Sequence, residues 1–395
     1  MFSAKSRAIV KSTAPLLAEK GTQITDLFYK KLFSHHPELK HVFNMANQAK
    51  GEQSRALADA VFRYATHIDE LEKLGPMVSR IAHKHASLQV APEHYPIVGK
   101  YLLEAIQNHL GLEAADSILE AWAEAYQQLA VIFVATEENI YAENENKTGG
   151  GRGFRAFRMA DIRYEAQDVK SFYLEPVDGL PIATFAPGQY VGVKVKPDIE
   201  GYDEIRQYSL SNAPGENYYR ITVKAEANVN EVTGKVSNFL HHAKRGDELL
   251  LQPPTGDFIV ARPENDIALI AGGVGITPLL SMILQRIQSG KNTSNLTFIQ
   301  CCRNAEHHIM ADELRTLSNQ YGFKYFVSYE AGDGADFTGY LTKDIIQQWL
   351  GGANPDIYFC GPKPFMVALN NLLGELDISE DKRFYETFGP NIRLS

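Results

Sequence analysis

The spacing of apolar positions divides the chain into regions of different periodicity. Up to about residue 141, apolar residues recur three and four positions apart, as in "ITDLFYKKLF" and "RALADAVFRYATHI". This spacing is typical of amphipathic helices. Proline or glycine interrupts it at "SHHPEL", "LGPM" and "VAPEHYP". We therefore predict an all-α domain of roughly six to eight helices.

The rest of the chain follows β and then mixed patterns. Short runs of period two, such as "QYVGVKV" and "YRITVKA", predict a small antiparallel barrel or sandwich. Further on, β-type runs such as "DIALIAGG" alternate with helical runs such as "TPLLSMILQRIQ". That alternation indicates βαβ units and a doubly wound parallel sheet. The polar, glycine-rich "AENENKTGGGRG" is typical of a linker. The predicted domains are 1–141 (all-α), 142–153 (linker), 154–262 (antiparallel β-barrel) and 263–395 (α/β, parallel sheet).

Composition narrows the class of protein. The 395 residues carry a formal net charge of −9, and no basic cluster is present, which argues against a nucleic-acid partner. No apolar run approaches the roughly 20 residues of a membrane span, and the first residues lack the pattern of a signal peptide. The three cysteines form neither a disulfide framework nor a C-x-x-C site. We expect a cytoplasmic protein without stable membrane association.

A glycine-rich turn between a strand and a helix stands at "LIAGGVGITPLLSM". Gly272, Gly273 and Gly275 would let the backbone approach a phosphate closely, Thr277 can cap the helix, and Pro278 suits the first helical turn. Because Pro278 occupies the third glycine position, the turn departs from G-x-G-x-x-G. Taken alone, it fits a phosphate site and a merely tight turn equally well.

Four further motifs accompany that turn. "RQYSLSN" places a cation (Arg206), a ring (Tyr208) and a hydroxyl (Ser209) along one strand edge, as a flavin would require. "GKVSNFL" opens a helix with a second turn of the phosphate-binding type. "YFCGPKPFM" ends a strand with a thiol beside Gly-Pro, and "YETFGP" lies near the end of the sequence.

In this order the motifs resemble the ferredoxin–NADP reductase type of flavin oxidoreductase, over residues 154–395. The resemblance implies FAD held by Arg206, Gln207, Tyr208 and Ser209, with Tyr190 near the adenine. Phe388 would cover the flavin and Glu386 would lie near its reactive edge. The cofactor-binding residues implied in addition are Gly234, Val236, Ser237, Gly272, Gly273, Val274, Gly275, Ile276, Thr277, Pro278, Cys360, Gly361, Pro362, Gly389 and Pro390. The choice between NADH and NADPH stays open, since Arg303 can either accept a 2′-phosphate or be solvated.

The helical region carries candidate haem residues. In "HPELKHVFNMANQAKGEQSRAL", Phe43 follows a turn, and Gln53 and Leu57, four apart, share a helix face. Phe43 and His85 have the separation that globins use between the haem-packing phenylalanine and the proximal histidine. The whole chain thus resembles the flavohaemoglobin family. That implies haem b, with His85 as the axial iron ligand, Tyr29, Gln53 and Leu57 on the distal side, and Tyr95 and Glu137 behind His85.

Neighbouring residues compete for these roles. Glu138 is adjacent to Glu137; counting back four from Tyr141 selects Glu137, and Glu138, about 100° round the helix, is expected to face solvent. His83 would lie about 200° from His85 on its helix, so the two cannot face the same iron. The histidine pairs at 35–36, 241–242 and 307–308 are interpreted as surface residues.

The order of the modules predicts a reaction. NAD(P)H delivers two electrons as a hydride, haem iron accepts one at a time, and FAD connects the two. The residues themselves support NAD(P)H-driven O₂ chemistry at haem, and the resemblance implies a nitric oxide dioxygenase that detoxifies nitric oxide to nitrate, with nitric oxide and O₂ as substrates. The alternatives are a broad NAD(P)H-dependent reductase of flavins, ferric iron or hydroperoxides, and a gas-sensing globin. We expect a monomer.

Overall fold

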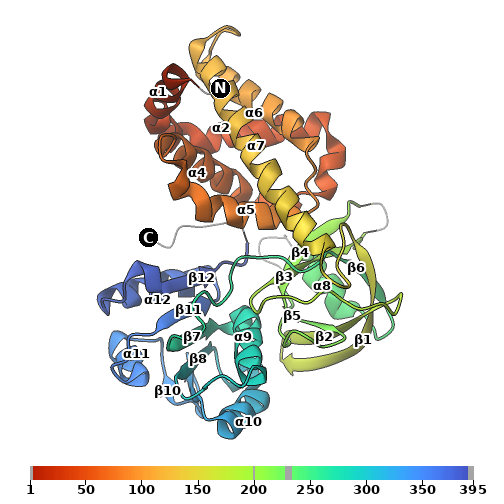
Figure 1. Ribbon diagram of the computed structural model, residues 1–395, viewed down its shortest axis with the longest axis vertical. Coiled ribbons are helices and arrows are strands. Elements are labelled where there is room, and N and C mark those ends of the chain that lie inside the picture. The colour runs from red at the N-terminus through yellow and green to blue at the C-terminus, as the bar shows by residue number, and fades with distance from the viewer. Residues whose placement is uncertain (1–2, 199–200, 227–233, 390–395) are drawn as a thin grey trace. The chain divides into compact units, whose positions relative to one another are not determined.

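A computed structural model describes residues 3–198, 201–226 and 234–389. The chain forms two compact units (Figure 1), each described by itself below. Unit 1 comprises Met1–Asn146, Gly151–Gly153 and Lys194–Arg206, and unit 2 comprises Lys147–Gly150, Phe154–Val193 and Gln207–Ser395. No helix among the described residues is both long and apolar enough to cross a bilayer.

Unit 1 is helical. Its described part holds seven α-helices, within the predicted range: α1 (Ala4–Ser12), α2 (Ala14–His35), α3 (Met45–Ala49), α4 (Glu52–Thr66), α5 (Gly75–Ser87), α6 (His94–Leu110) and α7 (Ser117–Glu145), with 3₁₀ turns η1 (Pro37–His41) and η2 (Leu71–Leu74).

Local signals mark the helix ends in unit 1. The Asp116 carboxylate accepts a hydrogen bond from the Ile118 N–H and so caps α7, and Gly111 ends α6 in the left-handed conformation. The apolar faces of α2, α4, α6 and α7 meet in one core around Phe28, Tyr64 and Trp122.

The first sheet of unit 2 is antiparallel along most of its length, with strand order β4-β3-β6-β1-β2-β5. Its elements are β1 (Arg155–Ala166), β2 (Val169–Pro176), β3 (Tyr190–Val195), β4 (Glu204–Ser209), β5 (Tyr219–Lys224), α8 (Lys235–His242) and β6 (Glu248–Leu251). A bridge between Leu210, just after β4, and Ile221 in β5 joins the two edges of the sheet. Such closure leaves few exposed edge groups, and it agrees with the predicted small barrel.

The second sheet is parallel, with order β10-β9-β8-β7-β11-β12. Its elements are β7 (Ile267–Gly272), η3 (Gly273–Gly275), α9 (Ile276–Gln288), β8 (Leu296–Cys302), η4 (Ala305–His307), α10 (Ala311–Tyr321), β9 (Lys324–Tyr329), β10 (Phe337–Thr338), α11 (Lys343–Leu350), β11 (Asp356–Cys360), α12 (Lys363–Glu375), η5 (Glu380–Lys382) and β12 (Arg383–Glu386). The predicted doubly wound α/β architecture is confirmed.

Helices cover both faces of this sheet. Alternate residues of β7 pack against different helices: Leu269 joins the core under α9, and Ile270 joins the core under α11 and α12. From β7 the chain proceeds outward through β8 and β9 and then returns to the other side of β7 as β11. The strand order therefore reverses between β7 and β11, which is where ligands bind in open α/β sheets.

Candidate functional site

Three of the predicted residues meet in one hydrogen-bonded group within unit 1. His85 comes from α5, Tyr95 from α6 and Glu137 from α7. The Nδ1 of His85 lies 2.7 Å from Oε1 of Glu137, and the Tyr95 hydroxyl donates to the same oxygen over 2.5 Å. The Nδ1 of His85 is also 3.2 Å from the Tyr95 hydroxyl. We call these residues the His85 triad.

The hydrogen bonds of the triad orient the imidazole. An ionised carboxylate can only accept hydrogen bonds. The Nδ1–H of His85 therefore donates the hydrogen bond to Glu137, which leaves Nε2 with a free lone pair. Within the described chain, no residue forms a hydrogen bond with that Nε2. Burial, reinforced by the charge of Glu137, raises the pKa of Tyr95, so its hydroxyl stays protonated and remains a donor.

The two adjacent glutamates have different surroundings. Glu137 is 2% exposed, whereas Glu138 is exposed and its carboxylate pairs with Arg152 at 2.5 Å. The other nearby histidines have different positions: His83 is only partly buried, and Nδ1 of His94 accepts from the Ala91 N–H over 3.1 Å. His85 is the histidine of this stretch whose ring nitrogen lies at hydrogen-bond distance from the buried Glu137 carboxylate.

The donor set fits haem iron. In the part of the chain that the structure describes, no three His, Cys, Asp or Glu side chains gather as a metal site. A single oriented imidazole is too few protein ligands for zinc, which takes three or four. Haem iron, in contrast, needs only an axial imidazole from the protein.

Two of the predicted distal residues, Tyr29 and Gln53, carry a polar atom that forms no hydrogen bond with any described residue. Tyr29 on α2 is 5% exposed and lies among the rings of Phe28, Phe33 and Phe43, at centroid distances of 4.7, 5.7 and 5.9 Å. Its hydroxyl makes no hydrogen bond to any described residue, and burial raises its pKa, which keeps it a donor. The buried Oε1 of Gln53 on α4 likewise has no partner among the described residues.

Such burial without partners fits a polar ligand in this pocket. An unsatisfied buried polar group costs about 1–3 kcal/mol, so the buried Oε1 of Gln53 favours a ligand or water nearby. Leu57, one turn after Gln53, is partly buried against the helical core. The residues therefore fit a pocket that holds haem and a small polar or diatomic ligand.

Sequence reasoning missed several supporting residues. Oε1 of Gln48 on α3 is buried and has no partner in the described chain, like Oε1 of Gln53. The Tyr126 hydroxyl donates to the Tyr95 carbonyl over 2.6 Å, and the Tyr141 hydroxyl donates to the Val90 carbonyl over 3.2 Å. Both tyrosines lie on α7 together with Glu137. Their spacing from Glu137 along this helix is the feature of the sequence that could have identified them.

The predicted flavin residues lie on β3, β4 and the start of α8. The Arg206 guanidinium donates to the buried Glu204 carboxylate over 2.9 Å and to the Ile205 carbonyl over 2.7 Å, which holds its charge in place. Gln207 and Tyr208 are partly buried and Ser209 is buried. Tyr190 is buried, and its ring packs on Gly256, where a Cβ would lie 2.9 Å from the ring.

The α8 turn is tight as well. Gly234 precedes the helix, and the Ser237 hydroxyl donates to its carbonyl over 3.0 Å. A Cβ on Gly234 would lie 2.6 Å from Cβ of Glu226, so only glycine fits there. Val236 and Ser237 are buried in the first turn of α8.

The two predicted glycine turns of the nucleotide site meet at the switch point. A Cβ on Gly275 would lie 2.1 Å from the Cys360 carbonyl oxygen and 2.6 Å from the Gly361 nitrogen, so these backbones are in direct contact. A Cβ on Gly361 would lie 3.0 Å from Cα of Gly272. Gly273, at φ +50°, has no atom within 4 Å of a Cβ position, which leaves its backbone open to a ligand.

The rest of the nucleotide motif is placed by α9 and by the ends of β11 and β12. Val274 is partly exposed, and Ile276 and Pro278 are buried in the first turn of α9. Pro362 precedes α12. The predicted cap at Thr277 is wrong: its hydroxyl donates to the Val274 carbonyl over 3.1 Å, because Thr277 already lies inside the helix.

Cys360 and Glu386 are register partners at the ends of β11 and β12. Burial, with the nearby Glu386 charge, raises the pKa of the Cys360 thiol, which therefore stays protonated. Phe388 is 48% exposed, and Gly389 has φ +133°. Pro390 lies outside the described residues.

His308, in the pair 307–308, is not at the surface as predicted. His308 is 5% exposed, its Nδ1 is 2.8 Å from the Tyr329 hydroxyl, and its Nε2 is 2.7 Å from the Tyr325 hydroxyl. The interpretation as a surface residue was wrong because the loop after β8 folds back over β9 and buries the ring. Burial, together with the nearby Arg315 charge, lowers the pKa of His308 to about 4, although the Asp312 and Asp336 charges act in the opposite direction.

This burial predicts acid sensitivity. Between its folded value near 4 and the unfolded value of about 6.5, the unfolded chain binds a proton at His308 that the folded chain does not. Stability should therefore fall as the pH falls, by about 2 kcal/mol between about pH 7 and about pH 5. Thermal unfolding of His308→Gln should lose much of this dependence, with the exposed His242→Gln as the control. Equal pH dependence in all three proteins would contradict the prediction.

Three family profiles match the chain in order: "Globin" over residues 26–132, "Oxidoreductase FAD-binding domain" over 157–259 and "Oxidoreductase NAD-binding domain" over 269–371. A flavohemoprotein of Pseudomonas putida is 45% identical over an alignment of 401 positions that covers all of both chains. One from Deinococcus radiodurans is 43% identical and covers 99% of this chain and 98% of its own.

A solved structure has the same arrangement of elements. The flavohemoglobin of Malassezia yamatoensis with bound FAD and heme superposes with a TM-score of 0.87, at 27% identity, over 98% of this chain and 100% of its own. The FAD/NAD-binding domain of a Vibrio cholerae nitric oxide dioxygenase matches 60% of this chain and 100% of its own, at 35% identity and a TM-score of 0.55.

Proposed function

The chain belongs to the flavohemoprotein family, and from that premise we propose that it is a nitric oxide dioxygenase. Its cofactors are haem, FAD and a nicotinamide nucleotide, as predicted, and it is an oxidoreductase driven by that nucleotide. In the proposed reaction, two NO, two O₂ and one NAD(P)H give two nitrate ions, NAD(P)⁺ and one proton. The chain would act as a monomer in the cytoplasm.

The His85 triad is the observation that carries the proposal. A 2.7 Å hydrogen bond from Nδ1 to the buried Glu137 makes His85 a more electron-rich ligand. Haem supplies an iron that binds O₂ and exchanges single electrons, and an electron-rich axial ligand favours activation of O₂ over its simple storage. The second hydrogen bond, from Tyr95, holds the Glu137 carboxylate in the position where it accepts from His85.

The remaining roles follow the chemistry of each side chain. Tyr29, kept protonated by burial, would donate a hydrogen bond to an oxygen ligand, Gln53 would assist it, and Leu57 with Phe43 would restrict the pocket to small molecules. Arg206 on β4 would supply the cation for FAD, and the open backbone at Gly273 would receive the phosphates of the nucleotide. We propose residues 1–141, 154–262 and 263–395 as the haem, FAD and nucleotide domains, joined by the linker 142–153.

The function is tested by steady-state kinetics in air. Nitric oxide should accelerate NADH oxidation by the purified holoprotein, with nitrate as the product. NADH oxidation that ferric iron or flavins stimulate and nitric oxide does not would favour the broad reductase instead. Absence of NADH turnover with any of these acceptors would favour a gas-binding globin.

The triad makes a separate prediction. Glu137→Gln removes the charge that His85 faces, so nitric oxide-dependent turnover should fall by about 10–100-fold, the usual effect of losing a partner of a metal-bound histidine. The iron–histidine stretching frequency in resonance Raman spectra should fall as well. Glu138→Gln is the matched control, because Glu138 is exposed and paired with Arg152. Equal turnover in the two variants would contradict the role of Glu137.

A further inference from the structure

One segment of the FAD-binding region belongs to the helical unit. Residues 194–206 run from the end of β3 into β4 and lie within the range 157–259 that the FAD-binding profile matches, yet they are part of unit 1. We call residues 194–206 the strap; the structure describes 194–198 and 201–206 of it. The strap therefore carries sequence of the predicted flavin region into the unit that contains the predicted haem residues.

The strap contacts the turn η1 of the helical unit. The Asp203 N–H donates to Nδ1 of His41, the last residue of η1, over 3.0 Å. The ring of Tyr202 lies edge-on to the ring of His41 at a centroid distance of 5.1 Å, and the Lys40 ammonium lies 5.4 Å from the centre of the Tyr202 ring. A hydrogen bond, an aromatic pair and a cation–π contact thus stabilise one contact. We call these four residues the His41 clasp.

The hydrogen bond defines the state of the histidine in the clasp. Because Nδ1 of His41 accepts from a backbone N–H, that nitrogen carries no proton. The Asp203 carboxylate pairs instead with the Lys194 ammonium, at 3.0 Å, and lies 3.9 Å from Nδ1 of His41. The ion pair joins the two ends of the strap, and the hydrogen bond joins the strap to η1.

On the helical side, the clasp is tied to the phenylalanine predicted to pack on haem. The Phe43 N–H donates to the Leu39 carbonyl over 3.2 Å, so His41 and Phe43 lie in one tight turn. Leu39 is buried in the helical core. The Phe43 ring packs on the rings of Phe33 and Tyr29, at centroid distances of 5.3 and 5.9 Å. A displacement of His41 would therefore be transmitted to the predicted distal pocket.

On the strap side, the clasp is tied to the predicted flavin cation. Glu204, next to Asp203, is 4% exposed, and its carboxylate accepts from the Arg206 guanidinium over 2.9 Å. Arg206 follows Asp203 by three positions, and Phe43 follows His41 by two. These two chain segments together span at most about 18 Å even when extended. The clasp therefore connects the predicted flavin strand to the predicted haem pocket through a short path within unit 1.

We propose that the His41 clasp positions the flavin strand at Arg206 against the haem-packing turn at Phe43 and thereby sets the rate of electron transfer from FAD to haem. This inference rests on the proposed function, in which both cofactors are bound. One NADH yields NAD⁺, one proton and two electrons, and haem accepts these electrons one at a time. Because electron transfer slows steeply as the distance between two centres grows, a contact that fixes this distance controls the rate. His41 and Asp203 are positioning residues in this scheme.

Hydrogen exchange measures the clasp independently of turnover. His41→Ala removes the acceptor of the Asp203 N–H, and the loss of one hydrogen bond should raise the exchange rate of the strap by about two- to tenfold. The His41 side chain is 44% exposed, so its replacement should not prevent folding. Equal exchange of the strap in His41→Ala and in the wild type would overturn the proposal.

Two variants control this measurement. His41→Asn should restore the exchange rate of the wild type, because Oδ1 of asparagine is an acceptor at the position of Nδ1. His36→Ala should leave the strap unchanged, since His36 precedes the same turn and its ring bonds to Glu38 at 2.8 Å. Exchange that rises equally in His36→Ala would show a general loosening of η1 and would contradict the clasp.

Anaerobic stopped-flow mixing of the holoprotein with NADH tests the electron-transfer role. In His41→Ala, the flavin absorbance should show FAD reduction at the rate of the wild type, whereas the Soret band should show haem reduction slowed by about two- to tenfold. His41→Asn should recover the haem step. Haem reduction at the rate of the wild type in His41→Ala would overturn the role. If these rates change as expected and nitric oxide does not stimulate NADH oxidation, the proposed function fails while the clasp stands.

Discussion

Replacement of His85 by alanine is expected to abolish haem retention and nitric oxide-dependent NADH oxidation, and to leave flavin reduction by NADH intact. Within the triad, Nδ1 of His85 faces Tyr95 and Glu137, and its other ring nitrogen, Nε2, keeps a lone pair that can bind iron. Its loss should reduce turnover by more than about 100-fold, beyond the 10–100-fold typical of losing an outer partner. Soret absorbance, flavin content and turnover measured on one preparation check the prediction.

His83→Ala is the matched control for this variant, because His83 lies on the same helix but in a different direction from its axis. It should retain haem and activity. FAD content and reduction of ferricyanide by NADH should be the same in both variants, since the FAD- and NAD-binding profiles match residues 157–259 and 269–371, outside the helical region. Haem retention and full turnover in His85→Ala would exclude His85 as the ligand.

Gly275→Ala is expected to disable the entry of electrons from the nucleotide. The new Cβ would lie 2.1 Å from the Cys360 carbonyl oxygen and 2.6 Å from the Gly361 nitrogen. Both are backbone atoms at the end of a central strand, so β7 and β11 must separate at their carboxyl ends. Overpacking of this kind costs about 3 kcal/mol. Displacing the nucleotide by about 1 Å should slow hydride transfer to FAD by about 100-fold.

Stopped-flow reduction of FAD by NADH measures this effect, and thermal unfolding measures the stability. Gly374→Ala is the control, since Gly374 lies in α12 and its Cβ would meet only the Arg383 guanidinium at 3.6 Å, an ordinary contact. Alanine favours a helix over glycine by about 1 kcal/mol, so this control should be neutral or stabilising. Haem reduction by dithionite should remain unchanged in both variants. A normal rate of FAD reduction in Gly275→Ala would show that the close contact has no role in the site.

The predictions that succeeded rest on local patterns. Helical spacing predicted the α-helices of unit 1, period-two runs predicted the antiparallel sheet, and alternating runs predicted the parallel one. Apolar periodicity reports which face of an element is buried, and that depends only on neighbouring residues. The two corrections have different causes. Tertiary packing buries His308 under the loop after β8, whereas α9 begins at Ile276, so Thr277 lies inside the helix rather than at its cap.

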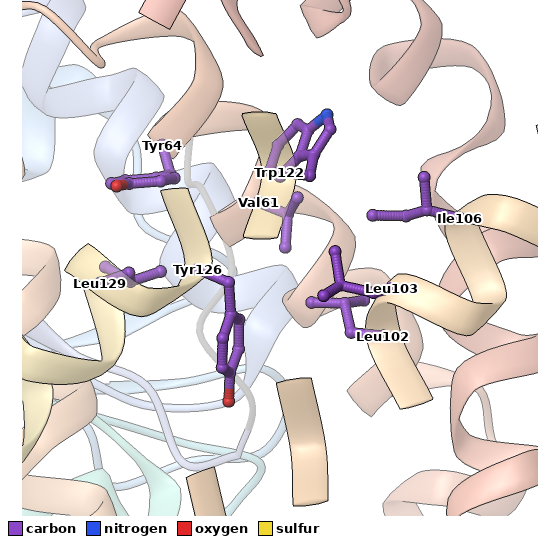
Figure 2. Close-up of a pocket in the computed structure, with 8 residues that line it drawn as sticks. All are labelled: Val61, Tyr64, Leu102, Leu103, Ile106, Trp122, Tyr126 and Leu129. Atoms are coloured by element: carbon purple, nitrogen blue, oxygen red, sulfur yellow. The ribbon is translucent and has the colours of Figure 1, made fainter. Parts of the chain in front are cut away.

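The sequence by itself determined the order of the three modules and the motifs that open each candidate site, because glycine turns, strand ends and helix faces are local properties. Only the tertiary structure decided which groups meet. His85 and Glu137 are 52 positions apart and touch because α5 packs on α7, and Gly275 contacts Cys360 because β7 and β11 are adjacent. A small apolar cavity of about 20 Å³ among α4, α6 and α7 (Figure 2) was invisible in the sequence for the same reason, since a void is defined by the side chains of several helices together and by none of them alone.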